Sequence, residues 1–199
     1  MQNLYLFKVI ILSPIAFICL VLPIFYIFFL NNVFTGGEDF STSRKVAKKI
    51  ASILKSNYTE NGNILDMGSC RGDFTICIKQ HIKDLNVTGI DNSGFRVYFS
   101  KLNAFLFRQK VKFILGDFFE HDLRPYNIIY LYVPQEILPK IEAKILKQCK
   151  HGTVVVTYRV SLNRLKLKEV HDSEKQPSLF DLFFHLYNKE REKVYFYIV

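Results

Sequence analysis

The sequence predicts an α/β protein with a Rossmann-like, doubly wound and mainly parallel sheet. Short apolar runs alternate, from about residue 40 to residue 160, with segments whose apolar residues recur at helical spacing. Such alternation produces parallel strands joined by right-handed crossovers, with helices on both faces. About half of the 199 residues are hydrophobic, which is enough for one ordinary core but not for two. The stretch "ILDMGSCRGDF" at 64–74 supplies a third observation: an apolar strand that stops at an acid, a turn with two glycines and the start of a helix.

The first element expected is a transmembrane helix over Val9–Leu30. These 22 residues carry no charge and would span about 33 Å as a helix, enough for a bilayer core. A cleaved signal peptide is the alternative, but it would have a shorter apolar region and a small-residue cleavage site. We therefore expect an anchor over residues 1–34 and a globular domain over residues 35–199.

The cations that flank this run predict its orientation. Only Lys8 and the amino terminus precede the run, whereas Arg44, Lys45, Lys48 and Lys49 follow it. The positive-inside rule then predicts a single-pass membrane protein whose domain faces the cytoplasm.

The net charge and the cysteine spacing indicate which membrane, nucleic-acid and metal partners to expect. The formal charge is +9, so the domain would be drawn to an anionic membrane face, unless its lysines are simply a solvated surface. The cations are scattered and no RNA-binding signature appears, so no nucleic-acid partner is expected. Cys70, Cys77 and Cys149 lack metal-ligand spacing and no metal site is expected. The sequence predicts no oligomeric state.

The remaining elements follow in order. Ser41, Thr42 and Ser43 are candidate caps for a helix that runs to about Lys55, and Pro134 opens a later one. Predicted strands cover residues 63–67, 86–92, 111–115, 127–132, 153–160 and 193–199, with helical stripes at 74–85, 95–106 and 138–145. Residues 164–176 read as charged and irregular, and 178–188 as a strand or a buried helix.

The turn from Asp66 to Asp73 is the candidate ligand site, because doubly wound sheets bind ligands beyond the carboxyl ends of their strands. A GxxxxGK phosphate loop is absent, and a GxGxxG loop started at Gly68 would need glycines where Cys70 and Asp73 stand. A carboxylate at a helix start repels a pyrophosphate, which disfavours NAD and ATP.

S-adenosylmethionine fits this turn better, because it carries a sulfonium cation and an amino group but no phosphate. Asp66 is compatible with those cations, and Gly68 and Gly72 would let the backbone approach the ligand. Asp91 would accept hydrogen bonds from the ribose hydroxyls, and Asp117 would face the adenine amino group. The alternative for each acid is a helix cap or turn residue. The predicted cofactor contacts are Asp66, Gly68, Ser69, Gly72, Asp91, Asn92, Asp117 and Phe118.

Residues 40–159 resemble class I, seven-strand methyltransferases. More narrowly, they are similar to the membrane-anchored lysine methyltransferases related to those of the ATP synthase c-subunit and the adenine nucleotide translocase, and to their bacterial relatives. The matching passages are "DMGSCRGDF", "GIDNS" and "GDFFEHDLRPYNIIYLYVPQEILPKIEAKILKQCKHGTVVV". The resemblance implies that Asp66, Gly68, Gly72, Asp91 and Asp117 contact S-adenosylmethionine.

Three features depart from the family pattern. Cys70 stands where a middle glycine is usual, Asn127 where an acid is common, and the tail after Arg159 differs. The resemblance implies methyl transfer to a lysine of a protein at or near the membrane, with Tyr132 orienting the acceptor. Tyr132 as a packing aromatic is the alternative. A methyltransferase for a small or lipid-like acceptor, and a decayed scaffold that no longer catalyses, also stay open.

Overall fold

The computed structural model of the chain describes residues 14, 17–23, 26, 42–58, 61–173 and 192–199. The chain forms two compact units, residues 1–39 and residues 40–199. In the first unit, residues 17–23 are helical. Most of the predicted membrane span at 9–30 lies outside the described residues. Within the described part, no helix combines the length and the apolar character that crossing a bilayer requires.

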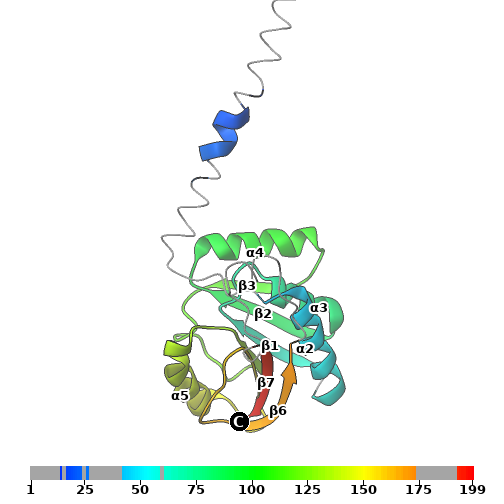
Figure 1. Cartoon of the computed structure of the whole chain (residues 1–199), viewed down its shortest axis with the longest axis vertical. Coiled ribbons are helices and arrows are strands. Elements are labelled where there is room, and N and C mark those ends of the chain that lie inside the picture. Colours follow the sequence, from blue (N-terminus) through cyan, green and yellow to red (C-terminus); the bar gives the residue numbers. More distant parts are fainter. Residues whose placement is uncertain (1–13, 15–16, 24–25, 27–41, 59–60, 174–191) are drawn as a thin grey trace, which may run out of the picture. The chain divides into compact units, whose positions relative to one another are not determined.

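The second unit is built on one seven-stranded sheet with the strand order β3-β2-β1-β4-β5-β7-β6 (Figure 1). The strands are β1 Gly62–Met67, β2 Leu85–Asp91, β3 Lys112–Leu115, β4 Ile128–Leu131, β5 Val154–Tyr158, β6 Lys166–Asp172 and β7 Lys193–Ile198. The first five strands pair in parallel, whereas β7 lies antiparallel between β5 and β6. The strand order reverses between β1 and β4, which is where such sheets bind ligands.

The helices follow the predicted stripes and caps. They are α2 Arg44–Asn57, α3 Asp73–His81, α4 Gly94–Leu106, the short 3-10 helix η1 Gln135–Ile137 and α5 Leu138–Gln148. The Ser43 hydroxyl accepts a hydrogen bond from the Val46 amide at the start of α2, and the Ser93 hydroxyl does the same for Arg96 in α4. Each cap satisfies an amide that the first helical turn leaves without a partner.

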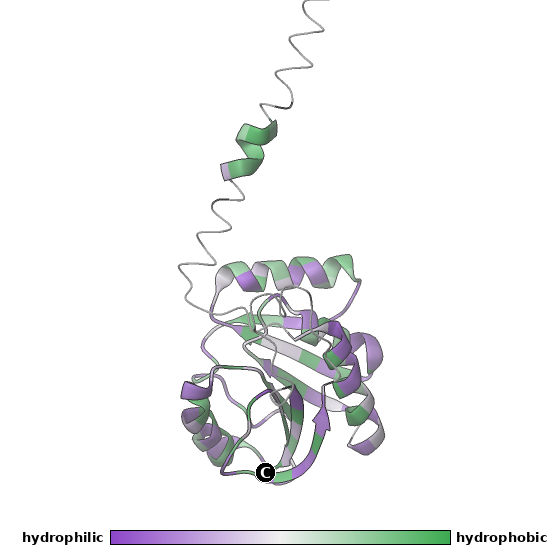
Figure 2. Ribbon diagram, viewed as in Figure 1, coloured by the Kyte–Doolittle hydropathy of each residue, from purple (hydrophilic) through white to green (hydrophobic). Residues whose placement is uncertain are grey.

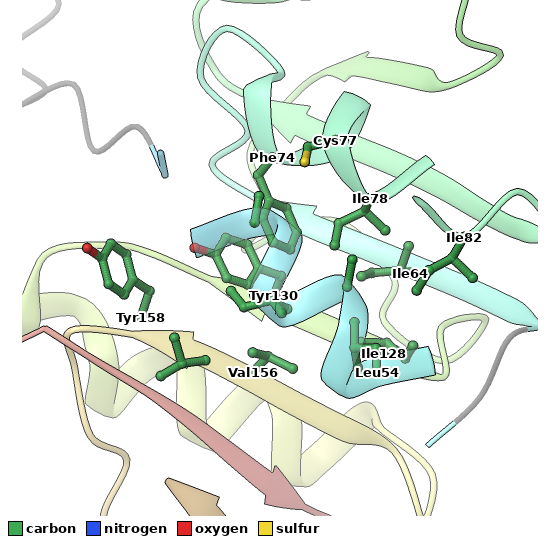
Figure 3. Close-up of a cluster of buried hydrophobic side chains, with 14 of the residues drawn as sticks. Leu54, Ile64, Phe74, Cys77, Ile78, Ile82, Ile128, Tyr130, Val156 and Tyr158 are labelled. Carbon is green, nitrogen blue, oxygen red and sulfur yellow. The ribbon is translucent and has the colours of Figure 1, made fainter. Parts of the chain in front are cut away.

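Two clusters of buried side chains cover the two faces of the sheet. Neighbouring strand residues point to opposite faces, so Ile64 belongs to one cluster and Leu65 to the other. The first cluster joins the sheet to α2 and α3 through Leu54, Phe74 and Ile78 (Figure 3). The second joins it to α5 through residues such as Ile141. The predicted two-sided α/β architecture is therefore confirmed.

The segment predicted to be charged and irregular contains a strand instead. β6 pairs antiparallel with β7 from Lys166 to Asp172, with an irregularity between Leu167 and Glu169. At the sheet edge β6 has a neighbour on one side only and stays largely exposed, so it needs few apolar residues. Hydrophobic patterning therefore gave no signal for it. The predicted strand at 193–199 is confirmed as β7, and residues 178–188 lie outside the described part of the chain.

Candidate functional site

A crevice opens at the carboxyl ends of the strands, where the sheet order reverses. Its walls come from the residue that precedes the cap of α2, from the end of β1 and the turn that follows, and from the end of β4. The lining residues are Thr42, Asp66, Gly68, Ser69, Cys70, Asp73, Phe74, Tyr130 and Tyr132. Four predicted site residues, Asp66, Gly68, Ser69 and Tyr132, therefore share one hollow.

The turn between β1 and α3 has left-handed backbone at every second residue. Gly68, Cys70 and Gly72 have φ values of 86°, 49° and 80°. The amides of Gly68 and Ser69 both donate to the Ile90 carbonyl, at 2.9 and 3.0 Å, which fastens the turn to the end of β2. Cys70 thus adopts a conformation that costs an ordinary residue about 1 kcal/mol or more.

The two glycines serve different purposes. A Cβ on Gly72 would lie 2.6 Å from Cζ of Phe113 and 3.2 Å from Cβ of Ser100, so packing of the turn against β3 and α4 requires glycine there. A Cβ on Gly68 would meet only Val133, at 3.8 Å. Gly68 therefore has room beside it and lines the crevice, while the predicted cofactor contact of Gly72 stays a prediction.

Asp66 is buried at the floor of the crevice. The Thr75 hydroxyl donates a 2.6 Å hydrogen bond to its Oδ2. Burial raises the pKa of Asp66 to about 7; the bond from Thr75 works against this rise, and the neighbouring Asp91 adds to it. A cation in the crevice would favour the ionised carboxylate.

Asp91 holds the glycine turn in place. Its Oδ2 accepts a 3.0 Å hydrogen bond from the Cys70 amide and its Oδ1 a 2.9 Å bond from the Ser93 amide. The side chain is buried, and Nη1 of Arg96 lies 4.0 Å from Oδ2. Asn92 follows it and is exposed. Asp91 already has a structural task, and its predicted ribose contact stays a prediction.

Asp117 and Phe118 lie at the same edge of the sheet. The Gly116 amide donates to the Asp91 carbonyl at 3.0 Å, so the end of β3 lies beside the end of β2. Asp117 is exposed, and its Oδ1 accepts a 2.7 Å hydrogen bond from the Phe119 amide, as a turn residue does. The three acids therefore end adjacent strands, but only Asp66 lines the crevice described above.

Ser69 lines the crevice, and its buried side chain packs over Gly89 of β2. Its side chain is 4% exposed, and its hydroxyl oxygen has no hydrogen-bond partner among the described residues. A buried hydroxyl left in this state costs about 1–3 kcal/mol, which a bound polar group would offset.

Tyr132 lines the crevice and connects it to a polar cluster that the sequence did not reveal. Its hydroxyl accepts a 3.0 Å hydrogen bond from Nη1 of Arg159, whose Nη2 donates to Glu192. Glu192 is buried before β7 and also accepts from the hydroxyls of Tyr158 and Ser173. Burial raises the pKa of Glu192, but these donors outweigh it and the pKa is lowered.

The two aromatic lining residues other than Tyr132 were also missed as site residues. Phe74 and Tyr130 stack with ring centroids 3.5 Å apart (Figure 3), and the Tyr130 hydroxyl shares a hydrogen bond with the Thr42 hydroxyl. Both aromatics lie on the expected helix and strand, but their pairing depends on a contact between distant segments. Arg159 offered a weak signal as a charged residue at a strand end, whereas Glu192 stands in a charged run and offered none.

Comparisons with known proteins agree with this geometry. A family model described as the ANTKMT methyltransferase domain matches residues 66–169, just over half of the chain. A carboxy-S-adenosyl-L-methionine synthase from Nautilia profundicola is 32% identical over 135 residues, which are 62% of this chain and 58% of that protein. The chain thus spans less than two thirds of this curated relative.

Two solved structures share the fold. An RNA methyltransferase from Salinibacter ruber, in complex with S-adenosyl-L-homocysteine, has 20% identity and a TM-score of 0.65, covering 80% of this chain and 93% of its own. An O-methyltransferase from Bacillus cereus, also in complex with S-adenosyl-L-homocysteine, has 16% identity and a TM-score of 0.52 over 66% of this chain and 63% of its own. At these identities the likeness shows the fold alone.

Proposed function

Because the chain belongs to the family of ANTKMT methyltransferase domains, which are class I S-adenosylmethionine-dependent methyltransferases, we propose that it methylates a lysine of a protein at or near a membrane. The family match confirms the predicted resemblance, and with it the class of enzyme and S-adenosylmethionine as the cofactor. The lysine acceptor and the membrane location are the proposal.

The crevice at the switch point is the observation that carries the proposal. It offers the buried Ser69 hydroxyl, without a partner among the described residues, and the Asp66 carboxyl to a ligand that has polar groups and positive charge. When bound, S-adenosylmethionine supplies an electrophilic methyl group on a sulfonium. Asp66, Gly68 and Ser69 would hold it, while Asp91 keeps the turn in shape.

Tyr132 and Arg159 would prepare the acceptor. A lysine attacks through its neutral amine, and desolvation in the crevice lowers the pKa of its ammonium form. Tyr132 lines the crevice, and its hydroxyl accepts a hydrogen bond from Arg159, whose charge is paired with Glu192. Tyr132 would orient the amine, and the proton that the ammonium loses would pass to solvent.

The proposed membrane location is supported by the uncharged run at 9–30 and by the cations after residue 43. Protease treatment of intact and of permeabilised cells tests the orientation. With the domain in the cytoplasm, cleavage of residues 42–199 needs permeabilised cells. Cleavage from outside intact cells would contradict that orientation.

Three alternatives compete with the lysine proposal. A small or lipid-like acceptor is one. A cofactor-modifying synthase, supported by the 32% identical relative from Nautilia profundicola, is another. A scaffold that no longer catalyses is the third, supported by the strained Cys70 in the turn.

One labelling experiment separates these candidates. The full chain is incubated with S-adenosylmethionine labelled in its methyl group, with a membrane fraction and with a small-molecule cell extract that can supply a carboxyl donor, and protein is then resolved from lipid. Label in lysine of a protein supports the proposal, and Tyr132→Phe should slow it. Label in lipid or in a small molecule favours the second acceptor class, and a carboxylated nucleoside seen by mass spectrometry favours the synthase. Calorimetry that finds no cofactor binding to the folded chain favours the scaffold.

A further inference from the structure

Helix α4 is apolar on the side that faces away from the core. Its inner side is formed by the buried residues Val97, Ser100 and Ala104. The outer side carries large apolar side chains instead, and Phe105 is 79% and Leu106 is 65% exposed. Hydrophobic residues recur along α4 (Figure 2). A soluble helix normally has the opposite polarity, with its polar residues outward.

This outer surface is continuous rather than a single exposed residue. Residues 98, 102 and 105 fall on one side of a helix with 3.6 residues per turn, and Tyr98, Leu102 and Phe105 are all exposed there. Leu115 at the end of β3 is 59% exposed, and its Cδ2 would lie 3.8 Å from a Cβ on Gly94 at the start of α4. Contiguous apolar surface of this kind marks an interaction site. We call Tyr98, Leu102, Phe105, Leu106 and Leu115 the α4 patch.

Cations predominate in the segment that carries the α4 patch, and the exposed Asp117 follows this segment. Residues 94–116 contain no Asp or Glu. Their cations are Arg96, Lys101, Arg108, Lys110 and Lys112, of which the last four are exposed. Apolar side chains rimmed by lysine and arginine are the combination that binds an anionic bilayer surface.

The start of the domain lies beside one end of the α4 patch. Arg44, the first residue of α2, places its guanidinium 4.4 Å from the ring centre of Phe107, which directly follows α4. The start of α2 therefore lies beside the residue that follows the carboxyl end of α4. Thirteen residues separate the end of the uncharged run at 9–30 from Arg44.

We infer that the α4 patch docks the domain onto the surface of a bilayer that contains anionic lipids. The aromatic and leucine side chains would enter the interface, and the surrounding cations would meet the headgroups. α4 starts at Gly94, directly after the Ser93 whose amide is bonded to Asp91, so a docked α4 would bring that edge of the sheet toward the lipid. The inference does not depend on the reaction that the domain catalyses.

Site-specific photocrosslinking in the full chain tests this inference. Phe105→p-benzoylphenylalanine is mixed with vesicles of phosphatidylcholine and phosphatidylglycerol, irradiated and read by mass spectrometry. The matched control is the same substitution at Leu146, an exposed leucine on α5, which packs on the other face of the sheet. We expect lipid adducts at position 105 that clearly exceed those at position 146.

Other adducts at position 105 would overturn the inference. A crosslink to a second copy, to another segment of the same chain or to an added membrane protein, in place of lipid, identifies a different occupant. Equal lipid adducts at positions 105 and 146 would also overturn it.

Separate variants test the contribution of the surrounding cations to lipid binding. Lys101→Gln and Lys110→Gln should each reduce the lipid adduct at position 105 about fivefold, as expected for one cation near an anionic surface. Lys166→Gln on the β6 edge, another exposed lysine, serves as the control and should leave the adduct unchanged. Adduct yields that are unchanged in both Lys101→Gln and Lys110→Gln would contradict the role of charge. Equal yields in vesicles without phosphatidylglycerol would contradict it too.

Discussion

Both halves of the sheet end at the crevice, but the residues at their strand ends are held in place by different kinds of contact. In the β1–β2–β3 half, Asp66, Asp91 and the glycine turn are close in sequence. Backbone amides hold Asp91 and the turn, and the nearby Thr75 hydroxyl holds Asp66. In the β4–β5–β7–β6 half, Tyr132, Arg159 and Glu192 come from distant segments and hold one another through side chains. The first half is therefore built on a local motif. The second half is assembled from long-range contacts.

The largest expected effect is a pH-dependent change in stability caused by the ionisation of Asp66, in the β1–β2–β3 half. Its pKa is about 7 in the folded protein against 3.8 as the ordinary value, so folding favours the protonated form. This contribution to stability is complete below about pH 4 and is lost as the pH rises to about 7. Asp66→Asn imitates the protonated acid, so the variant should match the wild type near pH 4 and exceed it above pH 7 by on the order of 4 kcal/mol.

Urea unfolding of both proteins between pH 4 and pH 8 measures this difference. Thr75→Val removes the hydrogen bond to Asp66 and should raise the carboxyl pKa further, shifting the transition to higher pH. If the stability of wild type and of Asp66→Asn changed with pH in the same way, the pKa of the Asp66 carboxyl would not be raised.

The second half is best tested at Glu192. Glu192→Ala leaves the Arg159 guanidinium without its buried counter-charge and should lower the free energy of unfolding by about 3 kcal/mol. Denaturant unfolding measures it. The exposed pair of Asp122 and Arg124 gives the control, since Asp122→Ala should change stability little. If both substitutions cost the same, the cluster beside Tyr132 does not hold this half together.

A smaller effect sharpens the comparison at Asp91. Asp91→Ala should weaken binding of S-adenosylmethionine by about 1–3 kcal/mol, because it removes the acceptor for the Cys70 and Ser93 amides as well as any ribose contact. Calorimetry measures the affinity. Asp117→Ala, at the exposed turn, is the matched comparison and should cost less. Unchanged affinity for Asp91→Ala would remove it from the cofactor site.

The smallest effect concerns Cys70. Cys70→Gly relieves a left-handed backbone conformation, partly offset by the greater freedom of glycine in the unfolded chain, for a net gain of about 0.5–1 kcal/mol. Cys70→Ser keeps the strain and should show no such gain. Thermal unfolding with and without cofactor compares the three proteins. A destabilised glycine variant would mean that the Cys70 side chain contributes more than its backbone costs.

The same division between local and long-range contacts separates what the sequence predicts from what it does not. The first strand, its turn and Asp66 were predictable because the apolar run, the acid and the glycines that identify them are neighbours in the sequence. β6 was missed because an edge strand with one neighbour needs little apolar patterning, and Glu192 because its partner Arg159 lies 33 residues away. Ser69 was among the predicted contacts, but the lack of a partner for its hydroxyl among the described residues appeared only with the structure.

The position of β7 has a consequence for how the domain is made. β7 is synthesised after the other six strands, yet it lies inside the sheet between β5 and β6. Until it emerges from the ribosome, β6 has no neighbour to pair with and β5 exposes one open edge to other chains. The domain therefore closes its sheet late, and a nonsense codon just upstream of Lys193 would remove an interior strand rather than trim a dispensable end.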